Sequence, residues 1–197
     1  MDRMSTKLFS IANILSFLRL GLVPVLGWLA ASGEDVLFLW VLGVCLISDA
    51  LDGYLARKLN QTSELGAKLD SWGDALTYAA MILGLYLLWP VIFSDQSIFL
   101  LMATLSFLVP LAVSAAKFGE YPSYHTLGAK IAALLIAPAY YLLIIIDADV
   151  WFRVVVLLYL LVALEEIVIT CLLSHSRTNI SSAWTLIKEL RNHSKSD

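Results

Sequence analysis

The sequence predicts an all-α, polytopic membrane protein with six transmembrane helices and a possible interfacial helix near its C-terminal end. Of its 197 residues, 60% are hydrophobic and only 15% are charged, and the mean hydropathy is +0.82. A soluble domain of this length needs far more polar surface. Apolar runs long enough to cross a bilayer recur along the chain, and an open sheet in lipid would leave backbone polar groups unsatisfied. Helices are therefore the expected form of every span.

Six apolar segments mark the predicted spans: 8–31, 36–57, 65–93, 98–117, 127–146 and 150–175. We interpret the first as a retained span and not as a cleaved signal peptide, because its apolar run is too long and Arg19 interrupts it. Short polar connections such as "SGED" at 32–35 and "DAD" at 147–149 leave no room for a second domain. We expect one six-helix domain over 1–179, followed by a tail over 180–197.

The tail places Ile180, Trp184, Ile187 and Leu190 at helical spacing. This pattern is typical of a short amphipathic helix that lies on a membrane surface. Disorder after the last span is the alternative that the sequence leaves open.

The distribution of basic residues predicts the orientation. With a cytoplasmic N-terminus, an even number of spans returns the C-terminus to the same side, and that side then holds nearly all lysines and arginines. The opposite side holds Arg153 alone, beside several acidic residues. This asymmetry follows the positive-inside rule and places both termini in the cytoplasm.

The stretch "SDALDGYLARKLNQTSELGAKLDSWGD" at 48–74 contains four aspartates beside apolar segments. Asp49 and Asp52 are three residues apart and Asp70 and Asp74 are four apart, so each pair lies on one helix face. If spans two and three pack as an antiparallel pair, the two acidic faces meet. Converging carboxylates repel one another unless a cation lies between them, and Mg²⁺ or Mn²⁺ suits oxygen ligands. Solvated helix flanks are the simpler alternative, but ionisable residues in membrane segments are costly and are usually functional.

The residues between the aspartates favour a phosphate ligand. Gly53 has no side chain, so another group can approach the backbone, and Arg57 one turn later offers a fork of donors suited to phosphate oxygens. Ala56 and Gly66 are small enough to let neighbouring membrane helices approach closely.

The run Asp49-x2-Asp52-Gly53-x2-Ala56-Arg57-x8-Gly66-x3-Asp70-x3-Asp74 resembles the signature of the CDP-alcohol phosphatidyltransferase family at every fixed position. The resemblance implies a core of six spanning helices, usually in a homodimer. It also implies transfer of the phosphatidyl group of CDP-diacylglycerol to a small alcohol, with release of CMP. By analogy with bacterial members, we expect an integral protein of the bacterial inner (cytoplasmic) membrane, with its active site at the cytoplasmic face and membrane lipids around it.

The resemblance also implies roles for individual residues. Asp49, Asp52, Asp70 and Asp74 would hold two divalent ions, Mg²⁺ or Mn²⁺, and Asp74 would also be the catalytic general base. The residues implied to contact the CDP-lipid are Asn13, Ser16, Gly53, Ala56, Arg57, Ser63 and Gly66. "NILS" departs from the family's Asn-x-x-Thr pattern, because Ser16 replaces the threonine and keeps the hydroxyl.

The acceptor is less well defined than the donor. In "KFGEYPSYHTLGAK" at 117–130, Lys117, His125 and Lys130 are candidates for acceptor binding, while the two lysines also fit ordinary positive-inside flanks. Glu165 and Glu166 lie deep in the sixth segment, with Arg19 a conceivable partner. Family members with phosphorylated acceptors often carry an arginine in this helix, so the glutamates weaken the case for glycerol-3-phosphate and admit an uncharged or amino-alcohol acceptor. Glycerol-3-phosphate is the leading acceptor, and inositol phosphate, serine and choline stay open.

A divalent-cation transporter is the alternative from another functional class, because acidic residues in spans also mark ion pathways. Such a pathway should continue as polar residues across the bilayer, whereas "VLFLWVLGV" and "AAMILGLYLLWPVIF" in the outer halves of spans two and three are apolar. The sequence favours an enzyme, and nothing in it indicates a nucleic-acid partner.

Overall fold

The computed structural model describes residues 11–58, 64–119, 126–173, 180 and 182–193, and every regular element in these ranges is a helix. The chain divides into two compact units, Met1–Ser94 and Asp95–Asp197. The all-α prediction is confirmed over the described residues.

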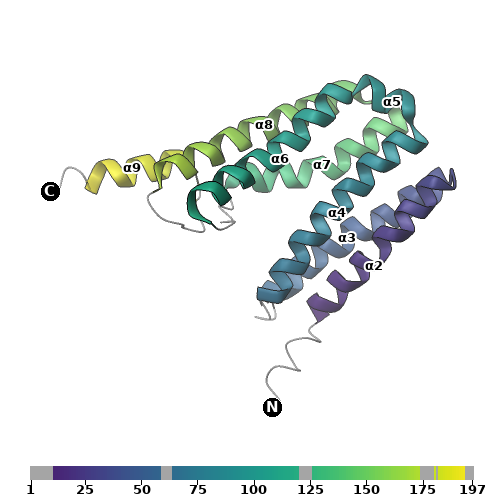
Figure 1. Ribbon diagram of the computed structural model, residues 1–197, viewed down its shortest axis with the longest axis horizontal. Helices are drawn as coiled ribbons and strands as arrows, with labels where there is room; N and C mark the ends of the chain where they lie inside the picture. The colour runs from purple at the N-terminus through teal and green to yellow at the C-terminus, as the bar shows by residue number, and fades with distance from the viewer. Residues whose placement is uncertain (1–10, 59–63, 120–125, 174–179, 181, 194–197) are drawn as a thin grey trace, which may run out of the picture. The chain divides into compact units, whose positions relative to one another are not determined.

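The first unit contains α2 (Ile11–Ala31), α3 (Asp35–Lys58) and α4 (Glu64–Leu88), followed by the short α5 (Pro90–Asp95). Helix α2 packs against both α3 and α4, as Figure 1 shows in purple and blue. The turn between α2 and α3 passes through Gly33, whose φ of +76° lies in the left-handed region that glycine adopts without steric cost. This tight turn allows α2 and α3 to lie side by side.

The core of the first unit is built around Phe38 of α3. Leu26, Phe38, Leu42 and Leu85 are all completely buried. A Cβ at Gly84 of α4 would overlap the ring of Phe38, so only glycine allows the two helices to approach this closely here.

The prediction of one continuous helix over the third span, 65–93, is wrong. Helix α4 ends at Leu88 and α5 begins at Pro90. Proline has no N–H to donate and disfavours helical geometry in the residue before it, here Trp89, so the helix stops and restarts. The ring of Trp89 packs edge-on against Phe38 at a centroid distance of 6.1 Å.

The second unit contains α6 (Ser97–Phe118), α7 (Leu127–Ile146), α8 (Asp149–Leu172) and α9 (Ala183–His193). Helix α8 packs against both α6 and α7. The N-cap of α7 is Thr126, whose hydroxyl accepts a hydrogen bond from the Ala129 N–H at 3.1 Å. Helix α7 ends at Asp147 in left-handed geometry (φ 51°), which turns the chain directly into α8.

Polar contacts join α6 and α8 near both ends. The Lys117 ammonium donates to the backbone carbonyls of Thr170 and Cys171, each at 2.9 Å. At the opposite end, Arg153 Nε donates to Gln96 Oε1 at 3.0 Å. Lys117 therefore satisfies carbonyl groups of the last turn of α8, which have no partner within the helix.

Helix α9 packs on the end of α8. Leu186 is 2% exposed and contacts the apolar cluster of Ile169 and Leu173. The Glu165 carboxylate accepts a hydrogen bond from the Ala183 N–H at 3.0 Å, where the partial positive charge of the α9 N-terminus favours an anion. Of the two alternatives for the tail, the helix is confirmed over Ala183–His193. Its position on a membrane surface stays a prediction.

Within the described residues, three helices are long and apolar enough to cross a membrane: Ser97–Phe118, Gly128–Ile146 and Asp149–Leu172. At about 1.5 Å per residue, helices of 22, 19 and 24 residues are ~28–36 Å long, which matches a hydrocarbon core of ~30 Å. Large apolar side chains such as Trp28, Trp40 and Leu134 are 65–75% exposed. The protein is an integral membrane protein, and the count of six spans stays a prediction.

Candidate functional site

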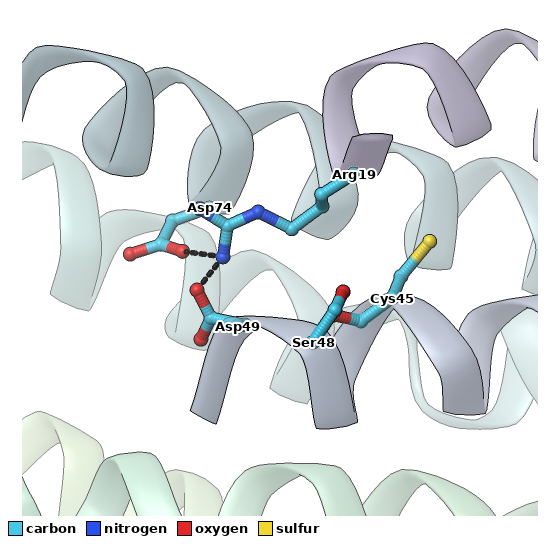
Figure 2. Close-up of polar contacts among 5 residues, drawn as sticks. All are labelled: Arg19, Cys45, Ser48, Asp49 and Asp74. Atoms are coloured by element: carbon cyan, nitrogen blue, oxygen red, sulfur yellow. Dashed lines mark hydrogen bonds and ion pairs between the residues drawn. The ribbon is translucent and has the colours of Figure 1, made fainter. Parts of the chain in front are cut away.

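The first unit brings together three charged side chains from three helices. Arg19 of α2 forms ion pairs with Asp49 of α3 and with Asp74 of α4 (Figure 2). Both carboxylates meet the same guanidinium nitrogen: Nη1 donates to Asp74 Oδ1 at 3.1 Å and pairs with Asp49 Oδ1. Two of the four aspartates therefore lie close together around one cation, on facing helices.

The exposure of the three side chains differs sharply. Arg19 is 1% exposed, whereas Asp49 is 37% and Asp74 52% exposed. Burying an unpaired charge costs several kcal/mol, and an opposite charge at hydrogen-bonding distance offsets that cost. The guanidinium thus lies on the buried side of the two carboxylates, and the carboxylates border the open side.

Gly73, the residue before Asp74, provides the space for the guanidinium. A Cβ at this position would lie 2.6 Å from both Nε and Nη2 of Arg19 and 2.8 Å from its Cζ. A residue with a Cβ at position 73 would therefore force the Arg19 guanidinium to shift.

Sequence analysis missed the role of Arg19. It named Glu165 and Glu166 as conceivable partners, but the structure pairs Arg19 with Asp49 and Asp74. The sequence could have predicted this pairing, because a charge inside a membrane segment usually pairs with an opposite charge. The aspartates were expected at the same cytoplasmic side as Arg19, so they were the better candidates for its partners.

Two buried serines lie near the paired charges. Ser48 precedes Asp49 and is buried, and its hydroxyl donates to the Cys45 carbonyl at 2.8 Å, one turn back along α3 (Figure 2). Ser16, one turn before Arg19 on α2, is 4% exposed. The donor-site role of Ser16 stays a prediction.

Apart from Gly66, the remaining predicted donor-site and metal residues fall where the side chains are not described. Helix α3 carries Asp52, Gly53, Ala56 and Arg57, helix α4 carries Gly66 and Asp70, and helix α2 carries Asn13. Gly66 is described and half-buried, while Ser63 and His125 lie outside the described residues. The backbone of α3 and α4 therefore places Asp52 one turn after Asp49 and Asp70 one turn before Asp74.

The donor set fits a hard divalent cation. Carboxylate oxygens from α3 and α4 already meet at one cationic nitrogen. Asp52 and Asp70 stand one turn away on the same two helices. Mg²⁺ and Mn²⁺ favour such oxygen ligands. The described side chains form no group of three or more potential metal ligands; the side chains of Asp52 and Asp70 are not among those described.

The residues predicted to bind the acceptor lie in the second unit. Lys117 ends α6 with its ammonium bound to the carbonyls of α8, and Lys130 is exposed on the first turn of α7. Glu165 lies close to the starts of two helices, because it caps α9 and a Cβ at Gly128 of α7 would be 3.6 Å from its Oε2. A glutamate beside two helix N-termini is electrostatically favourable, which gives this intramembrane acid a structural reason.

Comparison with known proteins identifies the class of enzyme to which this helical membrane protein with paired aspartates belongs. Residues 9–172 match the family model described as CDP-alcohol phosphatidyltransferase. The chain belongs to this family, which confirms the resemblance seen in the aspartate motif. Its members are phosphatidyltransferase enzymes of phospholipid synthesis.

Three curated relatives illustrate the range. The cardiolipin synthase (CMP-forming) of Streptomyces coelicolor is 32% identical over 74% of this chain and 69% of the relative. The human cardiolipin synthase (CMP-forming) is 39% identical over 38% of this chain, which spans only 28% of the relative. A CDP-diacylglycerol–glycerol-3-phosphate 3-phosphatidyltransferase of Arabidopsis thaliana is 32% identical over 41% of this chain and 36% of the relative. No solved structure matches the chain.

Proposed function

We propose that this protein transfers the phosphatidyl group of CDP-diacylglycerol to an alcohol and releases CMP, with Mg²⁺ or Mn²⁺ as cofactor. The observation that carries the proposal is the convergence of Asp49 and Asp74, from α3 and α4, on a single cationic group. Family membership supports the reaction class. The membrane-length apolar helices of the chain suit a donor whose acyl chains remain in lipid.

In this proposal, Asp49, Asp52, Asp70 and Asp74 hold two divalent ions. When bound, these ions neutralise the diphosphate of the donor and stabilise charge on the departing CMP. Contacts to the CDP-lipid are assigned to the predicted donor-site residues: Asn13, Ser16, Gly53, Ala56, Arg57, Ser63 and Gly66. Arg57 contributes a planar fork of donors that matches phosphate oxygens.

The proposed chemical step is a displacement at phosphorus. The acceptor hydroxyl oxygen forms a bond to the phosphorus that bears the diacylglycerol, and the bond from that phosphorus to the oxygen bridging it to CMP breaks. Asp74 takes the hydroxyl proton, and CMP leaves with the electron pair of the broken bond. A carboxylate is a weak base for a free alcohol, so the proton moves to Asp74 as the new bond forms. The 52% exposure of Asp74 leaves the carboxylate within reach of an acceptor.

For the acceptor, we propose a glycerol hydroxyl that lies beside a phosphate. Two sources share this chemistry: free glycerol-3-phosphate, which the sequence favours, and the headgroup of phosphatidylglycerol. The second follows from the cardiolipin synthase relatives, because cardiolipin carries two phosphatidyl groups on one glycerol. Lys117, His125 and Lys130 stay the predicted acceptor contacts. We also propose that the active site faces the cytoplasm and that the protein forms a homodimer.

The test is a product analysis on purified full-length protein in detergent, with CDP-diacylglycerol and Mn²⁺ or Mg²⁺. Separate reactions contain glycerol-3-phosphate, phosphatidylglycerol, inositol phosphate, serine or choline, and mass spectrometry identifies the lipid formed. We expect one glycerol-containing acceptor to give a new lipid together with an equal amount of CMP. A product only with inositol phosphate, serine or choline would overturn the acceptor. No product with any acceptor, from folded protein that binds metal, would overturn the reaction.

A further inference from the structure

Arg19 is the most deeply buried charged group among the described residues. It is 1% exposed and is one of the largest completely buried side chains. Its Nη1 lies between the carboxylates of Asp49 and Asp74 (Figure 2), and the guanidinium fits against Gly73 because that residue has no side chain. A long, charged side chain fixed in this way on three helices is costly to maintain. Packing alone does not require an arginine here.

We propose that Arg19 is a positioning residue for the metal site: it holds Asp49 and Asp74 at a fixed separation, so that ions bind to a preformed pair of ligands. The inference rests on the proposed function, because it assumes that these aspartates bind divalent ions. Arg19 acts through the aspartates and does not touch the substrate. The sequence motif contains no residue of α2, so this role is additional to the aspartate motif.

Arg19 Nη1 lies between the two carboxylates, and the guanidinium reaches them from the buried interior of the unit. The Arg19 side chain is 1% exposed, while the side chains of Asp49 and Asp74 are 37% and 52% exposed. An ion that approaches from the open side therefore meets the carboxylates before it meets the arginine. Outer-shell partners that orient metal ligands commonly change metal affinity by about 10- to 100-fold when they are removed. Without the guanidinium, the two like charges would move apart and the ligand pair would be lost.

Gly73 offers a second way to disturb the same contact. The methyl group added by Gly73→Ala would overlap the guanidinium, at 2.6 Å from Nε and Nη2, and would displace it without removing any charge. Gly84 provides a matched control on the same helix. A Cβ there overlaps the buried ring of Phe38, so Gly84→Ala disturbs helix packing to a similar degree but leaves Arg19 untouched.

The experiment titrates Mn²⁺ into metal-free, full-length protein in detergent and follows the free Mn²⁺ signal by electron paramagnetic resonance. It compares the wild type with Arg19→Met, Arg19→Lys, Gly73→Ala and Gly84→Ala, and thermal unfolding is measured on each. We expect the dissociation constant to rise about 10- to 100-fold in Arg19→Met and Gly73→Ala. Arg19→Lys restores part of the affinity, because it keeps the charge but not the planar fork. Gly84→Ala lowers the unfolding temperature and leaves the affinity unchanged.

Unchanged Mn²⁺ affinity in both Arg19→Met and Gly73→Ala would overturn the inference and leave the proposed function intact. Tighter binding in Arg19→Met would also overturn it, because Arg19 would then compete with the ion. If Arg19→Met does not fold, Gly73→Ala decides, since it retains every charged group. A wild-type protein that binds no Mn²⁺ or Mg²⁺ would overturn the metal dependence of the proposed function, and the inference with it.

Discussion

Replacement of Lys117 by methionine separates a structural role from the acceptor-binding role predicted for this lysine. The substitution keeps the length of the side chain and removes the ammonium, which donates to the carbonyls of Thr170 and Cys171 at 2.9 Å each. Hydrogen bonds to charged groups contribute about 1.5–3 kcal/mol when well buried. One of these two bonds is exposed, so we expect a total loss of about 1–2 kcal/mol. For a chain of this size, that is a fall of about 2–8 °C in the unfolding temperature.

The assay measures unfolding by tryptophan fluorescence in detergent and, on the same preparations, the KM for the acceptor. We expect Lys117→Met to unfold at lower temperature while its KM for the acceptor stays within about twofold of wild type. Lys130→Met is the matched control for stability, because Lys130 is exposed and its loss should change stability by less than about 0.5 kcal/mol. An unfolding temperature equal to that of the wild type, together with a tenfold higher acceptor KM in Lys117→Met, would refute the structural reasoning. The acceptor role would then be established.

Two further predictions concern the metal ions and the tail. Removing divalent ions with EDTA should abolish CMP release, and added Mn²⁺ or Mg²⁺ should restore it. The reason is that four carboxylates cannot bind a diphosphate without cations. CMP release that persists in EDTA would contradict this prediction. Glu165→Ala should loosen α9, because it removes the carboxylate that accepts a hydrogen bond from the Ala183 N–H. Trypsin should then cleave after Lys188 at least several times faster than in the wild type or in the control variant Glu166→Ala. Equal cleavage rates in all three proteins would show that the cap does not hold α9.

Sequence analysis predicted α6 and α7 of the second unit almost to the residue. The segment predicted at 127–146 is α7, Leu127–Ile146, and the segment predicted at 98–117 differs from α6 by one residue at each end. Both helices end at residues that adopt left-handed geometry, Gly119 and Asp147. Glycine and aspartate at these positions, next to a clear change in polarity, are local signals that a sequence displays directly.

The contacts of Arg19 were not predictable in the same way. Its partner Asp74 is 55 positions away along the chain, and their contact depends on how α2 and α4 pack. Gly73 showed no local signal either, because its importance comes from the side chain of another helix. Pro90 was a signal in the sequence that the helix breaks there. The prediction of one span over 65–93 followed the apolar composition and gave this proline too little weight. Composition identifies spans well, but it does not show where a span is interrupted.

The most direct test of the proposed function is the initial rate of acceptor-dependent CMP release by purified protein with CDP-diacylglycerol and Mn²⁺. The wild type is compared with Asp49→Asn and Asp74→Asn, with Asp147→Asn as a control that removes a carboxylate at the end of α7, outside the motif. We expect Asp74→Asn to lose at least about 100-fold in rate, because it removes both a metal ligand and the general base. Asp49→Asn should lose rate through weaker metal binding and recover in part at high Mn²⁺ concentration. Wild-type rates in Asp74→Asn would contradict the assignment of the site to these aspartates.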